Sequence, residues 1–296
     1  MGQPEREREE RICIPPFESL MTLTYGQINE FIDKLMEKLK EKRKSQILCM
    51  YYTEENEVMM DQADVLTVYT LLRQHGKCER LDIFLHSTGG DIHTAYQIAK
   101  LCRKYCSHFS VIVPEYAMSA ATLLCLGADE ILLSKIGHLG PLDPIVKIPK
   151  LGWLPAYAIR MAPKILEKEL ETEKGIDPRL KAASIVYPIA SQIDPYLFTT
   201  FANVPALAVT YGSELLQIAG KTEEEARRII TRLVYGYPVH GQVIDFEGAK
   251  NLNLNVKELE PDQESISSDI LLCLKALDKK HKFEGEPLSK PIIKLY

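Results

Sequence analysis

A single serine, Ser119, begins a run of small and apolar residues within PEYAMSAATLLCLGAD at positions 114–129. It follows an apolar, strand-like segment, at the point where a helix is expected to start. A serine at such a place is usually an N-cap. Here the neighbours Ala117 and Ala120 keep the space around the hydroxyl small. The helix that follows carries only Thr122 as a polar side chain, which indicates that this serine lies at a buried helix start.

A second strand-to-helix junction, HSTGGD at 86–91, carries the pair Gly89-Gly90. Glycines allow backbone conformations that a side chain forbids, and they let another group approach closely. Their amides are then free to face an anion, helped by the N-terminus of the next helix. A tight turn with a helix cap is the simpler interpretation. If the two junctions are neighbours in a sheet, however, a hydroxyl nucleophile and oxyanion donors meet at one point, as acyl transfer requires.

Strands alternate with helices over the part of the chain that must position these junctions. This order predicts an α/β fold with a largely parallel sheet. The expected helices are 24–44, 60–74, 91–106, a short one at 246–251 and a last amphipathic one at 265–280, and the expected strands are 47–53, 81–87, 109–115 and 130–134.

The remaining chain divides by composition. Residues 1–11 are charged and predicted to be a flexible tail, 12–280 a single domain, and 281–296 a polar, proline-containing C-terminal tail. Within the domain, 150–235 is mainly helical in composition and broken by prolines. We interpret it as a helical insertion or an oligomerisation segment.

The composition excludes several classes of function. A formal net charge of -5 over 296 residues does not favour nucleic-acid binding. The seven scattered cysteines indicate reduced thiols, and no second Cys or His pair has zinc-site spacing, so no metal and no cofactor are expected. The N-terminus lacks the apolar region of a secretory signal. The apolar stretch near 182–211 is too interrupted for a membrane span. We therefore expect a cytoplasmic protein.

Three motifs, STGGDIHTA (87–95), YAMSAATLLCLGADEI (116–131) and GHLGPLDP (137–144), agree in order and spacing with a known group. The chain resembles the Clp protease and signal peptide peptidase A superfamily, most closely the serine dehydrogenase proteinase family, over 45–145 and more loosely over 236–256. The resemblance implies a crotonase-like (Clp protease-like) fold of stacked β-β-α units, here with the helical insertion. It also implies Ser119 as nucleophile and an oxyanion hole from the amides of Gly89, Gly90 and Ala120. The chain has Thr88 where the motif usually has proline.

The resemblance leaves the general base open. Asp143 stands near the position of the Clp histidine, and His240 opens a segment similar to the one that carries the Clp aspartate. A swapped arrangement follows, with His240 as base and Asp143 orienting its ring, although a surface histidine and a turn aspartate are the simpler interpretations. Signal peptide peptidases use a lysine instead, for which Lys164 and Lys168 lie in range. His138 and His93 are further alternatives, whereas His86 ends a strand and is expected to be structural.

These observations predict an ATP-independent serine peptidase that cleaves peptide bonds through an acyl-enzyme on Ser119. Its partners would be a peptide or protein substrate and further copies of the chain in a homo-oligomer, as the resemblance implies. No Walker A motif is present, so any ATPase would be a separate partner. Two alternatives stay open: a crotonase-like acyl-CoA enzyme, and a non-catalytic Clp-like scaffold protein.

Overall fold

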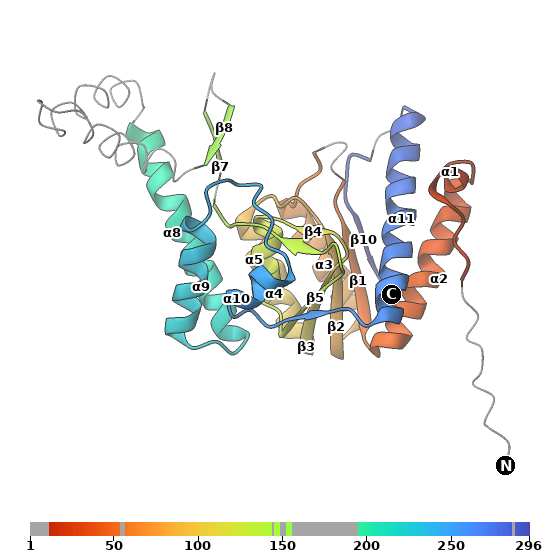
Figure 1. Ribbon diagram of the computed structural model, residues 1–296, viewed down its shortest axis with the longest axis horizontal. Coiled ribbons are helices and arrows are strands. Elements are labelled where there is room, and N and C mark those ends of the chain that lie inside the picture. Colours follow the sequence, from red (N-terminus) through yellow and green to blue (C-terminus); the bar gives the residue numbers. More distant parts are fainter. Residues whose placement is uncertain (1–11, 54–56, 144, 149–151, 156–194, 286–287) are drawn as a thin grey trace, which may run out of the picture.

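The computed structural model describes residues 12–53, 57–143, 145–148, 152–155, 195–285 and 288–296 (Figure 1). Its centre is a six-stranded sheet in the order β10-β1-β2-β3-β5-β9. All neighbours in this sheet are parallel except β10 and β1. The predicted α/β class with a mainly parallel sheet is therefore confirmed. The strands are β1 Gln46–Tyr51, β2 Cys78–His86, β3 Cys106–Val113, β5 Glu130–Leu133, β9 Val256–Glu258 and β10 Ile292–Leu295.

Helices cover both faces of this sheet. On one face lie α2 (Tyr25–Arg43) and α11 (Pro261–Phe283), which pack against each other beside the short α1 (Phe17–Leu20) (Figure 1). On the other face lie α3 (Gln62–His75), α4 (Ile92–Tyr105) and α5 (Ala120–Leu126). Side chains of β1 alternate between the two cores: Ile47 and Cys49 join α2 and α11, whereas Leu48 and Met50 face α3 and α4. Apolar residues on both faces are typical of a parallel sheet covered on both sides.

A second, smaller layer extends from the carboxyl ends of the main strands. The strand β4 (Tyr116–Ala117) pairs in parallel with β6 (His138–Leu139). Isolated bridges add Ser87 to Ala117, Met60 to Gly90 and Leu139 to Ile244. Two neighbouring parallel strands thus deliver the Gly-Gly turn and the Ser119 turn to the same edge, as the sequence predicts.

The C-terminal part differs from the expectation. The segment 281–296 is not simply a tail, because β10 pairs antiparallel with β1, and Tyr296 exchanges backbone hydrogen bonds with Ile47. A run as short as Ile292–Leu295 is too short to reveal an alternating pattern in the sequence. The helix α11 begins at Pro261 rather than at 265, since Pro261 suits the first turn of a helix.

The mainly helical segment is described only in part, since 156–194, like the tail 1–11, lies outside the described residues. Its described helices are α8 (Pro195–Ile218) and α9 (Glu223–Tyr235), which pack together. The hairpin of β7 (Ile145–Ile148) and β8 (Gly152–Pro155) was not predicted. The short helix α10 (Phe246–Asn251) forms where the sequence predicts it. None of the helices in the described part of the chain has the length and apolarity that a membrane crossing requires.

Candidate active site

Ser119 adopts a backbone conformation that an ordinary N-cap does not have. It joins β4 to α5 with φ 51° and ψ -119°, and its side chain makes no capping hydrogen bond. An N-cap residue is normally extended and accepts a hydrogen bond from the first turn. Positive φ is uncommon for a residue with a side chain, and such strain gathers at functional sites. The capping interpretation is therefore wrong, and the conformation is that of a strained strand-to-helix turn.

Gly89 packs directly against this turn. A Cβ atom at Gly89, which has φ 118°, would lie 2.9 Å from the carbonyl oxygen of Met118 and 2.9 Å from the Cβ of Ser119. Both the backbone conformation and the close approach therefore require glycine here. The two junctions that the sequence analysis paired are in contact.

Two backbone amides remain for an oxyanion at this contact. The Gly89 amide donates to Ser87 Oγ at 3.0 Å, so it is not available, which corrects the expectation that it helps form the hole. The Gly90 and Ala120 amides donate to no residue within the described part of the chain. Ala120 is the first residue of α5, where an N–H has no partner within the helix. Gly90 and Ala120 are therefore the candidate donors.

His240 and Asp143 form a close pair, although they are far apart in the sequence. His240 Nδ1 lies 2.7 Å from Asp143 Oδ1 and 3.0 Å from the Asp143 carbonyl oxygen. Both partners are acceptors, so Nδ1 carries the proton and Nε2 is left as the basic nitrogen. The hydrogen bond that His240 donates to Asp143 raises the pKa of His240 above its ordinary value, against the opposing effect of burial. The Asp143 side chain is only 1% exposed, so its charge is poorly screened.

A short series of contacts connects this pair to the Ser119 turn. Gly140, three residues before Asp143, packs so closely on Met118 that a Cβ there would lie 3.3 Å from the Met118 Cα. The backbone of Leu139 exchanges hydrogen bonds with Ile244, four residues after His240. Among the described residues, no hydrogen bond joins the Ser119 hydroxyl to His240. Such catalytic hydrogen bonds often form only when substrate is bound.

Thr122 connects the Ser119 turn to the loop that carries Asp143, a role that the sequence did not predict. Its fully buried hydroxyl lies 2.6 Å from the Ala117 carbonyl oxygen and 3.0 Å from that of Gly140, and it accepts from the Gly140 amide at 3.0 Å. It thereby ties the start of α5 to the loop that carries Asp143. A polar residue in an otherwise apolar helix was the signal that could have identified it.

We expect Thr122→Val to destabilise the protein by about 2–3 kcal/mol, because it leaves buried backbone groups of Ala117 and Gly140 without a partner. Chemical denaturation would measure the free energy of unfolding. Thr122→Ser, which retains the hydroxyl, is the matched control and should unfold within about 1 kcal/mol of wild type. Equal stabilities of the valine and serine variants would contradict this role.

The other histidines have different partners. His138 Nδ1 faces the Ile136 carbonyl oxygen at 3.1 Å, and His93 Nδ1 faces the Tyr211 hydroxyl at 3.0 Å. Neither is among the histidines paired with a carboxylate. His86 is buried and bonded to Glu115, consistent with a structural role. Lys164 and Lys168 lie outside the described residues, so the lysine alternative stays a prediction. The described side chains include no group of three or more His, Cys, Asp and Glu that could hold a metal ion.

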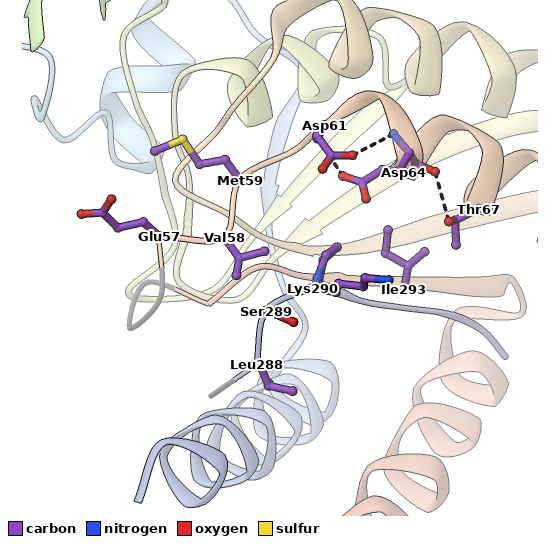
Figure 2. A pocket seen from close by; sticks show the side chains of 12 residues that line it. Glu57, Val58, Met59, Asp61, Asp64, Thr67, Leu288, Ser289, Lys290 and Ile293 are labelled. Carbon is purple, nitrogen blue, oxygen red and sulfur yellow. Dashed lines mark hydrogen bonds between the residues drawn. The ribbon is translucent and has the colours of Figure 1, made fainter. Parts of the chain in front are cut away.

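A cavity of about 650 Å³ lies beside the site rather than within it. Figure 2 shows it between the segment before and into α3, with Asp61 and Asp64, and the C-terminal segment that carries Lys290. Met60, next to its lining residue Met59, is bridged to Gly90. Ser119, His240 and Asp143 do not line this cavity. It is thus separated from Ser119 by the Gly-Gly turn.

Comparison with known proteins gives the family of the chain. The family model for ClpP-like SDH-type serine proteinases matches residues 20–179, which is more than half of the chain. The chain belongs to this family. The match includes Ser119 and both glycines of the Gly-Gly turn, and it ends before His240. The resemblance stated from the three motifs is confirmed.

The relatives with curated descriptions do not add a substrate. The chain is 28% identical to the uncharacterized protein MJ0137 of Methanocaldococcus jannaschii, over 81% of this chain and 78% of that protein. It is 26% identical to the uncharacterized protein MJ1495 of the same organism, over 61% of this chain and 53% of that protein, so the match spans about half of the second relative.

Two solved structures of the 1510-N membrane-bound stomatin-specific protease are also similar. One is a serine-to-alanine mutant with 13% identity and a TM-score of 0.35, covering 67% of this chain and 90% of that one. The other is a lysine-to-alanine mutant in complex with a substrate peptide, with 17% identity and a TM-score of 0.28, covering 70% and 90%.

Proposed function

We propose that this family member is a serine peptidase that cleaves peptide bonds through an acyl-enzyme on Ser119. The observation that carries the proposal is the strained conformation of Ser119 against Gly89, which a capping serine would not need. Strain of this kind persists only where the surrounding structure imposes it. Membership of a serine proteinase family agrees with the same residue as nucleophile.

In this mechanism His240 Nε2 accepts the Ser119 proton as Oγ attacks the carbonyl carbon of the scissile bond. Asp143 keeps the proton on Nδ1 and stabilises the imidazolium that forms. The Gly90 and Ala120 amides donate to the developing oxyanion. The imidazolium then protonates the leaving amine, and a water activated by the same nitrogen hydrolyses the ester.

The substrate class we propose is a peptide or protein, and the active form we propose is a homo-oligomer. We further propose that hydrolysis needs no nucleotide. The chain has no Walker A motif of its own, so any ATPase would be a separate partner. The acyl-CoA alternative would use the same two amides to polarise a thioester. Such a site has no need of a strained serine between them, which favours the peptidase.

The proposal predicts turnover of a mixture of internally quenched peptides by the purified protein without nucleotide. Fluorescence release would be measured with and without ATP, and binding of coenzyme A by calorimetry. We expect hydrolysis that is equal in the two conditions and no coenzyme A binding. Tight coenzyme A binding without peptide turnover would favour the acyl-CoA alternative.

A further inference from the structure

Next to the turns of the candidate site lies a partly buried polar connection that the proposed chemistry does not use. It consists of His86, Glu115 and Lys275, which come from the end of β2, from the residue before β4 and from α11. His86 Nε2 lies 2.8 Å from Glu115 Oε2, and Lys275 Nζ forms an ion pair with the same oxygen. The His86 side chain is 1% exposed; it stacks on the ring of Tyr51 and contacts the tilted ring of Tyr116.

The two strands that carry the site separate just before these residues. The ladder between β2 and β3 ends with the pair Phe84 and Ile112. Beyond it the chains lead to Gly89 on one side and Ser119 on the other. The side-chain bridge from His86 to Glu115 reconnects them, and an isolated bridge joins Ser87 to Ala117. These two connections therefore contribute to the spacing between the oxyanion turn and the nucleophile, together with the direct packing of Gly89 on Ser119.

The negative charge of Glu115 strengthens its hydrogen bond with His86. The hydrogen bond from His86, together with the ion pair from Lys275, lowers the pKa of Glu115 to about 2, so its carboxylate is ionised. Hydrogen bonds to an ionised acceptor are shorter and stronger than neutral ones. The Glu115 carbonyl oxygen also accepts from the His138 amide at 2.9 Å, which fixes β6 to the same residue. Glu115 thus joins the end of β2, the segment that leads into β4, and β6.

The third partner comes from the opposite face of the sheet. Lys275 projects from α11, and Asp278, one turn further along, bonds to Thr53 and lies 3.5 Å from the Tyr51 hydroxyl. Figure 1 shows α11 running beside β1, away from α5 and α9. Both contacts fasten α11 to the carboxyl ends of the strands, which is the edge that carries the site.

We propose that His86, Glu115 and Lys275 are positioning residues, through which α11 sets the spacing between Gly90 and Ser119 for catalysis. This inference rests on the proposed function. Because neither Glu115 nor Lys275 belongs to the nucleophile, base or oxyanion donors, their loss should lower kcat and leave KM nearly unchanged. A small misplacement of a reacting group can lower the rate by as much as about 10²-fold.

The test compares kcat and KM for peptide hydrolysis, and the rate of fluorophosphonate labelling of Ser119. Lys275 has a side chain 39% exposed, so Lys275→Met should fold, and we expect its kcat to fall about 10-fold with KM within about twofold. Lys275→Arg retains the cation and should stay within about twofold of wild type. Glu115→Gln, which removes the charge shared by both partners, should lower kcat by about 10²-fold. Thermal unfolding of each variant reports its stability separately.

Lys280→Met is the matched control. Lys280 also lies on α11 and forms an ion pair, but its partner is Glu284, at the end of the same helix, and not Glu115. This variant should leave kcat unchanged. The inference is overturned if Lys275→Met and Glu115→Gln retain wild-type kcat, or if Lys275→Arg or Lys280→Met loses as much as Lys275→Met. Failure of the proposed function looks different: the wild type itself would neither hydrolyse peptides nor be labelled, and the inference would fail with it.

Discussion

Replacing Ser119 by alanine is expected to lower peptide hydrolysis by about 10⁴-fold or more while the fold is retained. The attacking oxygen is lost, whereas the described residues place no hydrogen bond on the Ser119 hydroxyl that stability would depend on. Initial rates with the quenched peptide mixture measure the loss, and circular dichroism with thermal unfolding checks the fold.

Ser107→Ala provides the control for this change, because Ser107 is exposed on β3 and far along the strand from the turn. It should hydrolyse peptides at the wild-type rate. A Ser119→Ala protein that retains full activity would contradict the mechanism. It would also remove the reason to assign a histidine or a lysine as the general base for Ser119.

Replacing His240 by alanine should lower kcat by on the order of 10⁴-fold, because the proposed mechanism then lacks the group that accepts the Ser119 proton. His108→Gln is the matched control. His108 also lies near an aspartate, Asp129, with a similarly exposed side chain, but at the start of β3, where it cannot reach the site. Wild-type activity in His240→Ala would contradict His240 as the general base and would favour Lys164, Lys168 or His138 instead.

The pH dependence gives a sharper form of the same prediction. The base must be neutral to accept a proton, and Asp143 raises the pKa of His240 above the usual 6.5. The rate should therefore rise with pH through a midpoint above 6.5. In Asp143→Asn the carboxylate no longer favours the imidazolium, so the midpoint should move to lower pH. The plateau should fall by about 10³–10⁴-fold, because the proton is no longer held on Nδ1.

This profile is measured as kcat/KM between about pH 5 and pH 9, the range over which histidine changes charge. A midpoint that is unchanged in Asp143→Asn would show that the group being titrated is not His240. A lysine base would instead give a midpoint that His240→Ala leaves in place.

The sequence predicted the central strands and helices because their apolar residues repeat with the periods of buried strands and amphipathic helices. It also predicted that the Gly-Gly turn meets the Ser119 turn, since the carboxyl ends of neighbouring parallel strands share one edge. The order and spacing of the three family motifs supported the same arrangement of the two turns. The strand β10 was missed because four residues carry no readable period, and the hairpin of β7 and β8 was missed for the same reason.

The details of the site depended on geometry that no spacing encodes. Which amide remains free is decided by Ser87 Oγ, which takes the Gly89 amide and leaves that of Gly90. The pairing of His240 with Asp143 was suggested by the resemblance, but its 2.7 Å contact is seen only in the structure, where a bridge between Leu139 and Ile244 also joins the two segments. Lys275, on a helix more than a hundred residues from the motifs, had no signal in the sequence at all.

The most direct test of an activated serine is the intact mass of the protein after incubation with a fluorophosphonate. The wild type and Ser119→Ala would be treated in parallel, with peptide mapping of the modified site. The mechanism predicts one adduct on the wild type, located at Ser119, and none on the variant. An adduct on both proteins, or a wild type that hydrolyses peptides through a residue other than Ser119, would contradict the assignment of Ser119 as the nucleophile.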